Sequence, residues 1–133
     1  MKTITFIFTL LFITHTHASD KDFTSWMKKS DLDNYFQVLN NFDEDQDFFA
    51  KGHWITAAEG RWNQGNYEYR IKYSNTPSKK YSWYWHINQD YKTFIEQSAE
   101  YHNRGFRLVY GQSFKSATGE LRYQGVWHKD DFE

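Results

Sequence analysis

The chain has 133 residues, a formal net charge of −1 and an aromatic content of 21%. This length allows one small domain with a single core. A net charge this close to zero excludes the strongly basic surfaces that bind nucleic acid or anionic membranes, so we expect neither partner. The absence of cysteine excludes disulfides and a cysteine-linked lipid anchor, so stability has to come from packing of the aromatic side chains.

The first residues have the pattern of a secretory signal. Lys2 supplies a positive start, an apolar run follows from Ile4 to Ile13, and the small residue Ala18 precedes a polar segment. A helix that spans a membrane needs about 20 apolar residues, and this run is too short. The pattern predicts a cleaved signal over residues 1–18, a single mature domain over residues 19–133, no membrane association after cleavage, and a secreted or periplasmic location.

Two segments have the apolar spacing of a helix, at positions i, i+3, i+4 and i+7. In the first segment, Ser30 is the expected N-cap and Gly52 the expected stop. In the second, Asn88 or Asp90 is the expected N-cap, and Gly105 ends the helix. The residues at these spacings are Tyr35, Val38, Leu39 and Phe42 in the first segment and Tyr91, Phe94, Ile95 and Ser98 in the second.

Outside the helices the period changes to two, which is the alternation of a half-buried strand. The segments concerned are 53–56, 67–73, 83–87, 106–111 and 122–128. Residues 63–66 and 116–119 are rich in turn formers and predict two hairpins. We therefore expect an α+β domain, with an antiparallel sheet of about five strands and two helices packed on one of its faces.

The order of these elements repeats once along the chain. One stretch runs from Gly52 to Tyr73 and the other from Gly105 to Trp127; each contains a strand, a polar turn and a second strand, and each follows a helical segment. A supersecondary unit of this size cannot bury its apolar face alone. We therefore expect two related repeats, over about residues 31–73 and 83–129, that share one core.

The second repeat resembles a known family. Arg104-Gly105-Phe106-Arg107-Leu108-Val109, followed by Arg122-Tyr123-Gln124-Gly125-Val126-Trp127-His128-Lys129, is similar to the bacterial tandem repeat of polyglycine-hydrolase-like proteins. The similarity is clearest over residues 83–129 and weaker over residues 31–73. In that family the repeats accompany a separate serine hydrolase domain. The resemblance therefore implies an accessory or recognition role and no catalytic residue in this chain.

Several short motifs match catalytic or metal-binding patterns only in part. Ser25-Trp26-Met27-Lys28 has the Ser-x-x-Lys spacing of a serine nucleophile, but the companion motifs of such enzymes are missing. Asp43-Glu44-Asp45-Gln46-Asp47 resembles the start of a calcium loop, but Phe48 replaces its glycine and Trp54 its final glutamate. No metal, cofactor or catalytic residue is predicted. The histidines considered, none at a ligand spacing, are His53, His86, His102 and His128.

Exposed aromatic residues are the remaining functional signal. Trp62 lies in or beside a turn, and Tyr84 points away from the tryptophans on either side of it; flat rings of this kind suit sugar or peptide ligands. We predict an exported, non-enzymatic binding or accessory module that recognises a protein, peptide or glycan through Trp62 and Tyr84. The alternatives are a small secreted hydrolase with His86 or His128 as its base, and an inhibitor-type partner of another exported protein.

Overall fold

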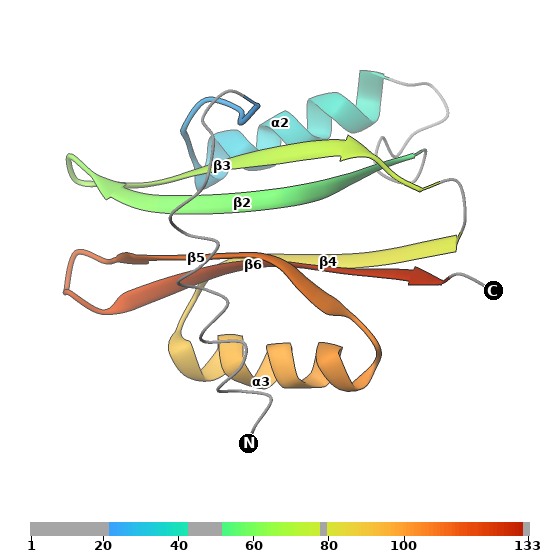
Figure 1. The fold of residues 1–133 in the computed structure, drawn as a ribbon. Coiled ribbons are helices and arrows are strands. Elements are labelled where there is room, and N and C mark those ends of the chain that lie inside the picture. Colours follow the sequence, from blue (N-terminus) through green and yellow to red (C-terminus); the bar gives the residue numbers. More distant parts are fainter. Residues whose placement is uncertain (1–21, 43–51, 78–79, 132–133) are drawn as a thin grey trace.

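The computed structural model describes residues 22–42, 52–77 and 80–131 (Figure 1). The predicted signal segment and the calcium-like stretch 43–47 lie outside these residues. The elements are β1 (Met27–Lys28), α2 (Lys29–Phe42), β2 (His53–Asn63), β3 (Asn66–Asn75), β4 (Lys80–Gln89), α3 (Tyr91–Asn103), β5 (Arg107–Lys115) and β6 (Leu121–Asp131).

The strands form two stacked antiparallel sheets, with the strand orders β1–β3–β2 and β4–β6–β5 (Figure 1). The α+β prediction is confirmed, whereas the prediction of one sheet of about five strands is wrong. The alternating strands bury their apolar faces against a second sheet. The short strand β1 was not predicted; Met27 pairs with Tyr69 there, and the Thr24 backbone N–H donates to the Ile71 carbonyl at 2.9 Å.

Both predicted hairpins are present. The β2–β3 turn consists of Gln64 and Gly65, whose φ values of 49° and 83° are positive, as a tight two-residue hairpin requires. The β5–β6 turn contains Gly119 with a φ of 89°. The two turns lie at the same end of the molecule, together with the start of α3 (Figure 1).

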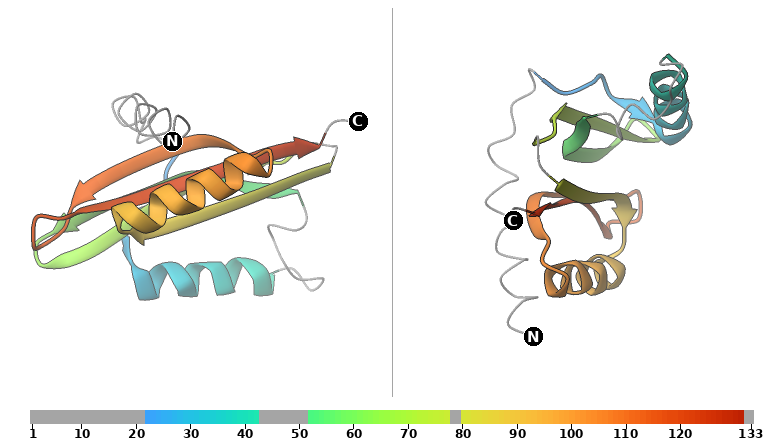
Figure 2. Two further views of the ribbon diagram at one scale, coloured as in Figure 1. Left: turned by 90° about the horizontal axis from the view of Figure 1, so that it is seen from below. Right: turned by 90° about the vertical axis from the view of Figure 1, so that its right-hand side faces the viewer.

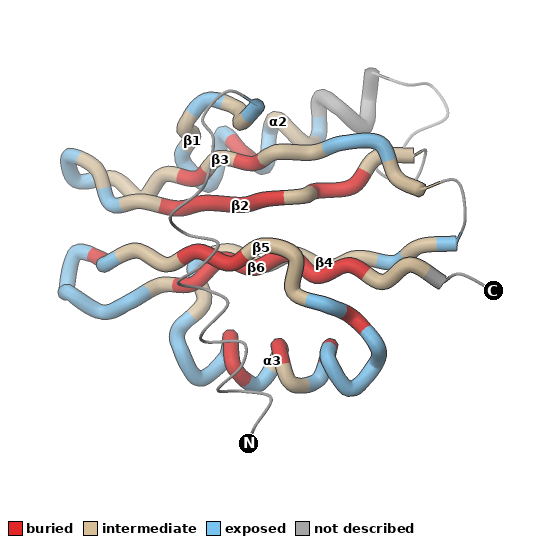
Figure 3. Tube along the Cα trace, viewed as in Figure 1, coloured by how far each residue is buried: buried red, intermediate tan, exposed pale blue. Residues whose placement is uncertain are grey.

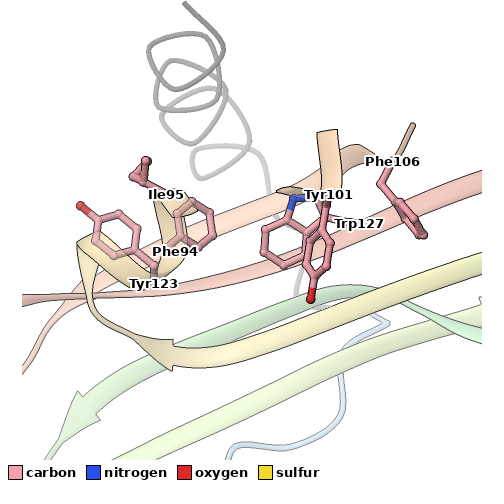
Figure 4. Packing of buried hydrophobic residues seen from close by; sticks show 6 residues of the cluster. All are labelled: Phe94, Ile95, Tyr101, Phe106, Tyr123 and Trp127. Atoms are coloured by element: carbon pink, nitrogen blue, oxygen red, sulfur yellow. The ribbon is translucent and has the colours of Figure 1, made fainter. Parts of the chain in front are cut away.

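Helix α3 covers the outer face of the β4–β6–β5 sheet (Figure 1), and Figure 4 shows the buried side chains that pack there. Its predicted caps are confirmed: the Asp90 carboxylate accepts a hydrogen bond from the Thr93 backbone N–H at 2.7 Å, and the chain leaves the helix through Gly105 at a φ of 91°. The helix packs onto the sheet through one apolar cluster. Its buried members are Phe94, Ile95, Tyr101, Phe106, Tyr123 and Trp127.

Helix α2 lies beside the β1–β3–β2 sheet and closes one side of the space between the sheets (Figure 2). Leu32 is fully buried in the cluster between the sheets, and the Phe36 ring centroid lies 5.4 Å from that of Trp85. The prediction that both helices pack on one face is therefore wrong. The apolar stripe of α2 meets side chains of both sheets, whereas α3 meets the outer face of one.

The two halves share their order of strand, helix and hairpin, and in each sheet the second hairpin strand is central. Their packing differs. Tyr35 is half-buried, and its Oη lies 3.2 Å from that of Tyr73, whereas the predicted counterpart Tyr91 is 46% exposed. Tyr69 and Tyr123 are alike in being buried on strands. The prediction of two related repeats is therefore not supported, because the two helices occupy different positions relative to their sheets.

Strand β2 lies against the second sheet, and side chains of that sheet bond to its edge. The Gly60 backbone N–H donates to Gln112 Oε1 at 3.0 Å, and the Gly60 carbonyl accepts from Gln112 Nε2 at 2.9 Å. His128 Nε2 donates to the Ile55 carbonyl at 2.7 Å. We call these contacts the seam. A buried edge strand otherwise leaves such groups unpaired, at a cost of about 1–3 kcal/mol each.

The surroundings of the seam are closely packed. A Cβ atom at Gly60 would lie 2.6 Å from Phe114 Cε1, so a side chain at this position would require the Phe114 ring to move. Gln124 is fully buried; it donates to Gln112 Oε1 at 2.8 Å and accepts from the Asn88 backbone N–H at 2.7 Å. A connected set of polar groups therefore crosses the apolar interior from β2 to the end of β4.

Replacing Gln112 tests the seam. Gln112→Leu leaves the Gly60 N–H and carbonyl buried without their amide partner, so we expect the free energy of unfolding to fall by about 2–4 kcal/mol. Urea unfolding provides the measurement. Ser113→Ala, a change at the next residue of β5, is the control and should alter stability by less than about 1 kcal/mol. A Gln112→Leu variant as stable as the parent would mean that the seam does not hold the sheets together.

Candidate functional site

Trp62 lies at the end of β2 beside the Gln64–Gly65 turn and is 40% exposed, as predicted. Its ring centroid is 4.6 Å from that of Tyr67, which in turn lies 6.1 Å from that of Phe114. One side of the Trp62 ring is thus supported by neighbouring aromatic side chains. In the described part of the chain, the other large apolar residues with this degree of exposure are Tyr91 and Leu121.

Tyr84 belongs to an aromatic stack between β4 and α3. Its ring lies parallel to that of Tyr101, with the centroids 4.4 Å apart, and 5.1 Å from that of Phe106. Arg104 Nη2 donates to Tyr84 Oη at 2.9 Å. The ring therefore contributes to packing. Trp62 and Tyr84 lie on different sheets and do not form one surface, so binding through either residue stays a prediction.

The two histidines considered as catalytic bases take part in structural contacts. His86 Nε2 lies 2.7 Å from Tyr101 Oη. The His128 ring stacks on Trp54 at 3.6 Å while its Nε2 donates to Ile55. Burial lowers the pKa of both imidazoles. Among the described residues, no serine, aspartate or glutamate side chain hydrogen-bonds to either ring, so the hydrolase alternative lacks its second catalytic group there.

The other motifs found in the sequence do not assemble a site. Ser25 is exposed in the extended lead-in and Lys28 lies on β1, whereas the Ser-x-x-Lys chemistry needs both residues on one helix. Residues 22–42, 52–77 and 80–131 contain no group of three or more histidine, aspartate or glutamate residues that could hold a metal ion. Within the same ranges, no helix is long and apolar enough to cross a membrane.

Glu59 and Arg70 form a nearly buried ion pair on β2 and β3. Glu59 is 5% exposed and accepts hydrogen bonds from Arg70 Nη2 at 2.6 Å and from Tyr110 Oη. Burial and this bond to Glu59 raise the pKa of Tyr110. The Arg70 guanidinium lies 4.3 Å from the Phe23 ring centroid and 4.5 Å from that of Trp26. The charges of Glu59 and Arg70 neutralise each other. We therefore assign this ion pair, together with Tyr110, a structural role in holding β2, β3 and β5 together.

An open groove with a volume of about 570 Å³ lies between the lead-in to β1, strand β3 and helix α2. We call it the tyrosine groove. Its size falls within the range of about 300–1,000 Å³ that is typical of small-molecule sites. Three aromatic rings and four polar side chains line it: Phe23, Tyr35, Tyr73, Asp22, Thr24, Lys72 and Ser74.

The hydroxyl groups of Tyr35 and Tyr73 meet in this groove at 3.2 Å. Burial and the contact with Tyr73 raise the pKa of Tyr35 to about 12, so its phenol stays protonated at neutral pH. Lys72 Nζ lies 5.1 Å from the Phe23 ring centroid. The groove thus offers flat rings beside groups that donate and accept hydrogen bonds.

The sequence did not reveal this groove. Tyr35 and Tyr73 fit the apolar faces of a helix and a strand, a pattern that predicts packing for both side chains. The one available signal was the choice of tyrosine at both positions, because its hydroxyl usually finds a polar partner or solvent. No spacing rule relates the two residues, which are brought together when α2 packs beside β3.

No protein-family model matches the chain, and no curated protein or solved structure is significantly similar to it. The resemblance to the tandem repeat of polyglycine-hydrolase-like proteins therefore stays a prediction. Function has to be inferred from the geometry of the chain itself.

The two aromatic residues singled out in the sequence should differ in their effect on stability. Tyr84→Ala removes a ring stacked on Tyr101 and the partner of Arg104, so we expect the free energy of unfolding to fall by about 2–4 kcal/mol. Trp62→Ala removes a partly exposed ring and should lower it by about 1 kcal/mol. Urea unfolding of both variants provides the comparison, and equal effects would contradict the assignment of Tyr84 to packing.

The buried histidines predict a loss of stability in mild acid. Because burial lowers the pKa of His86 and His128, the folded protein binds fewer protons than the unfolded chain, whose imidazoles have a pKa of about 6.5. The stability that the two neutral imidazoles contribute is therefore fully present above about pH 6.5. It is lost as the pH falls from there toward the lower pKa values of the folded state. We expect urea unfolding to give a free energy lower by about 1–2 kcal/mol at about pH 5.5 than at about pH 7.5.

Two variants test whether a buried histidine causes this dependence of stability on pH. His128→Gln removes one buried imidazole and should reduce the difference between the two pH values. His102→Gln, at an exposed position of α3, is the control and should keep it. The carboxylates of Glu68 and Asp90 have pKa values lowered from 4.5 and 3.8, so they titrate below this range. An undiminished difference in His128→Gln would show that the seam histidine does not titrate as proposed.

Proposed function

We propose that this chain is an exported, non-enzymatic binding module that holds a glycan in the tyrosine groove. The observation that carries the proposal is the combination of aromatic rings and hydroxyl groups in one open volume of about 570 Å³. A sugar presents apolar C–H faces together with hydroxyls that both donate and accept. Aromatic rings complement the former, and the hydroxyls of Tyr35 and Tyr73 complement the latter.

The charges in the groove favour a ligand without a large net charge. Lys72 and Asp22 line the same groove and carry opposite signs. A site for a strongly anionic or cationic ligand would concentrate one sign of charge. A neutral or weakly charged sugar fits this balance better than a phosphate or a polyamine.

Export and an accessory role are part of the proposal. They are supported by the signal-like pattern of residues 1–18 and by the resemblance of residues 83–129 to repeats that accompany a hydrolase domain. A module of this kind would bring a partner or substrate into contact with another exported protein without itself catalysing a reaction.

The test is a glycan array followed by titration calorimetry with a sugar that binds. Tyr35→Phe and Tyr73→Phe each remove one hydroxyl and keep the ring, so we expect each to weaken binding about tenfold, the equivalent of one hydrogen bond. Tyr91→Phe removes an exposed hydroxyl at the start of α3, outside the groove, and should leave binding unchanged.

Three results would contradict the proposal. The array could show no bound glycan, or the two groove variants could bind like the parent chain. A ligand whose binding depends on Trp62 and not on Tyr35 would place the site at the hairpin end of the molecule.

A further inference from the structure

Strand β4 is an edge strand of unusual composition. In the described part of the chain it pairs only with β6, along Lys80–His86 and at Gln89. None of its residues is buried, whereas β6 is buried continuously from Tyr123 to His128 (Figure 3). Proteins usually protect such an edge with charged residues, proline or a bulge.

The middle of β4 lacks these protective features. The segment Tyr81–Ile87 contains no charged residue, no proline and no glycine. Lys80 precedes it, and the pairing becomes irregular only after His86, close to Asn88 with its φ of 57°. An edge of tryptophan, tyrosine and isoleucine is a good template for another strand, because these residues favour extended structure and pair well across strands.

A second groove, with a volume of about 310 Å³, runs along this edge. Trp85, His86 and Ile87 line one side of it, and Lys29 and Asp33 of α2 line the other. Consecutive strand residues point to opposite faces of a sheet: the Trp85 ring packs on Phe36, and the His86 ring packs on Tyr101. Because neighbouring side chains point to opposite faces, three consecutive residues can line one groove only if the groove follows the edge of the strand. The backbone of β4 therefore faces this groove.

We propose that this edge is a strand-addition site, at which an extended, uncharged segment of a partner protein pairs with β4 in the groove between β4 and α2. An extended backbone is the group that satisfies a row of strand N–H and carbonyl groups, and a helix beside the strand confines it to one line. Figure 2 shows β4 as the outer strand of its sheet, with α2 on one side of it and α3 on the other.

Charge complementarity selects an uncharged segment. Lys29 Nζ and Asp33 Oδ1 are 2.8 Å apart, so the wall formed by α2 is neutral as a pair, and the facing part of β4 carries no charge. Alternate side chains of the added strand would lie beside Trp85 on one face and His86 on the other. β-Branched residues fit both positions, because they pair favourably with aromatic residues across strands.

The probe is a heptapeptide of alternating threonine and valine with blocked ends, titrated into the ¹⁵N-labelled chain. We expect saturable shifts of the amide signals of Trp85–Ile87 and Lys29–Asp33. The same peptide N-methylated at every residue keeps the apolar groups and loses every backbone donor, so it should not bind. If the methylated peptide binds as well as the parent peptide, the contact is apolar, and strand addition is wrong.

Two substitutions on one exposed turn of α2 distinguish peptide binding in the groove from peptide binding elsewhere on the surface. Asp33→Trp places a large side chain in the groove and should weaken peptide binding at least tenfold. Asp31→Trp, two residues earlier and so on the other side of the helix, is the matched control and should bind like the parent. Thermal unfolding of both variants checks that they stay folded. Equal binding by the two variants would overturn the proposed site.

One further outcome concerns a second copy of the chain. If the Trp85–Ile87 signals shift with protein concentration in the absence of peptide, β4 pairs with β4 of another molecule, and the proposal of a peptide partner is overturned. Glycan binding in the tyrosine groove uses different residues. The failure of either proposal can therefore be distinguished from the failure of the other.

Discussion

Where the two sheets meet, side-chain hydrogen bonds take the place of strand pairing. The stacking of the two sheets depends on these bonds. The Gln112 amide donates and accepts like one residue of a neighbouring strand, and it satisfies both backbone groups of Gly60. His128 does the same for the Ile55 carbonyl. Gly60 lies directly against the Phe114 ring, so a side chain at this position would displace that ring. Contact between β2 and the second sheet is thereby fixed in register as well as in distance.

The seam closes one side of the interior, and α2 closes another. Leu32 fills the space between the sheets, while the exposed turns of α2 stand beside β3 and β4. The tyrosine groove and the groove along β4 both have α2 as a wall, the first on its β3 side and the second on its β4 side. Helix α3, by contrast, is committed to packing on the outer face of its sheet. The proposed binding surfaces therefore gather around the helix that lies beside its sheet.

Aromatic side chains serve two purposes here. Most of those in the described part of the chain build the interior of a protein without disulfides, as the parallel stack of Tyr84 on Tyr101 illustrates. A few present a hydroxyl group or a ring edge to solvent, and these provide the hydrogen-bonding groups and flat surfaces of the grooves. Tyr35 belongs to both groups, because its ring packs with the interior cluster and its hydroxyl meets that of Tyr73 in the tyrosine groove. Residue type alone does not separate the two purposes.

The sequence by itself determined the local structure: the caps of α3 at Asp90 and Gly105, the two hairpin turns, and the strands with alternating side chains. These features depend on residues a few positions apart, so their signals survive in the linear pattern. Tertiary structure alone decided the number of sheets, the place of α2, the role of Gln112 in the seam and the meeting of Tyr35 with Tyr73. An alternating pattern shows that one face of a strand is covered, but the covering element can come from anywhere in the chain.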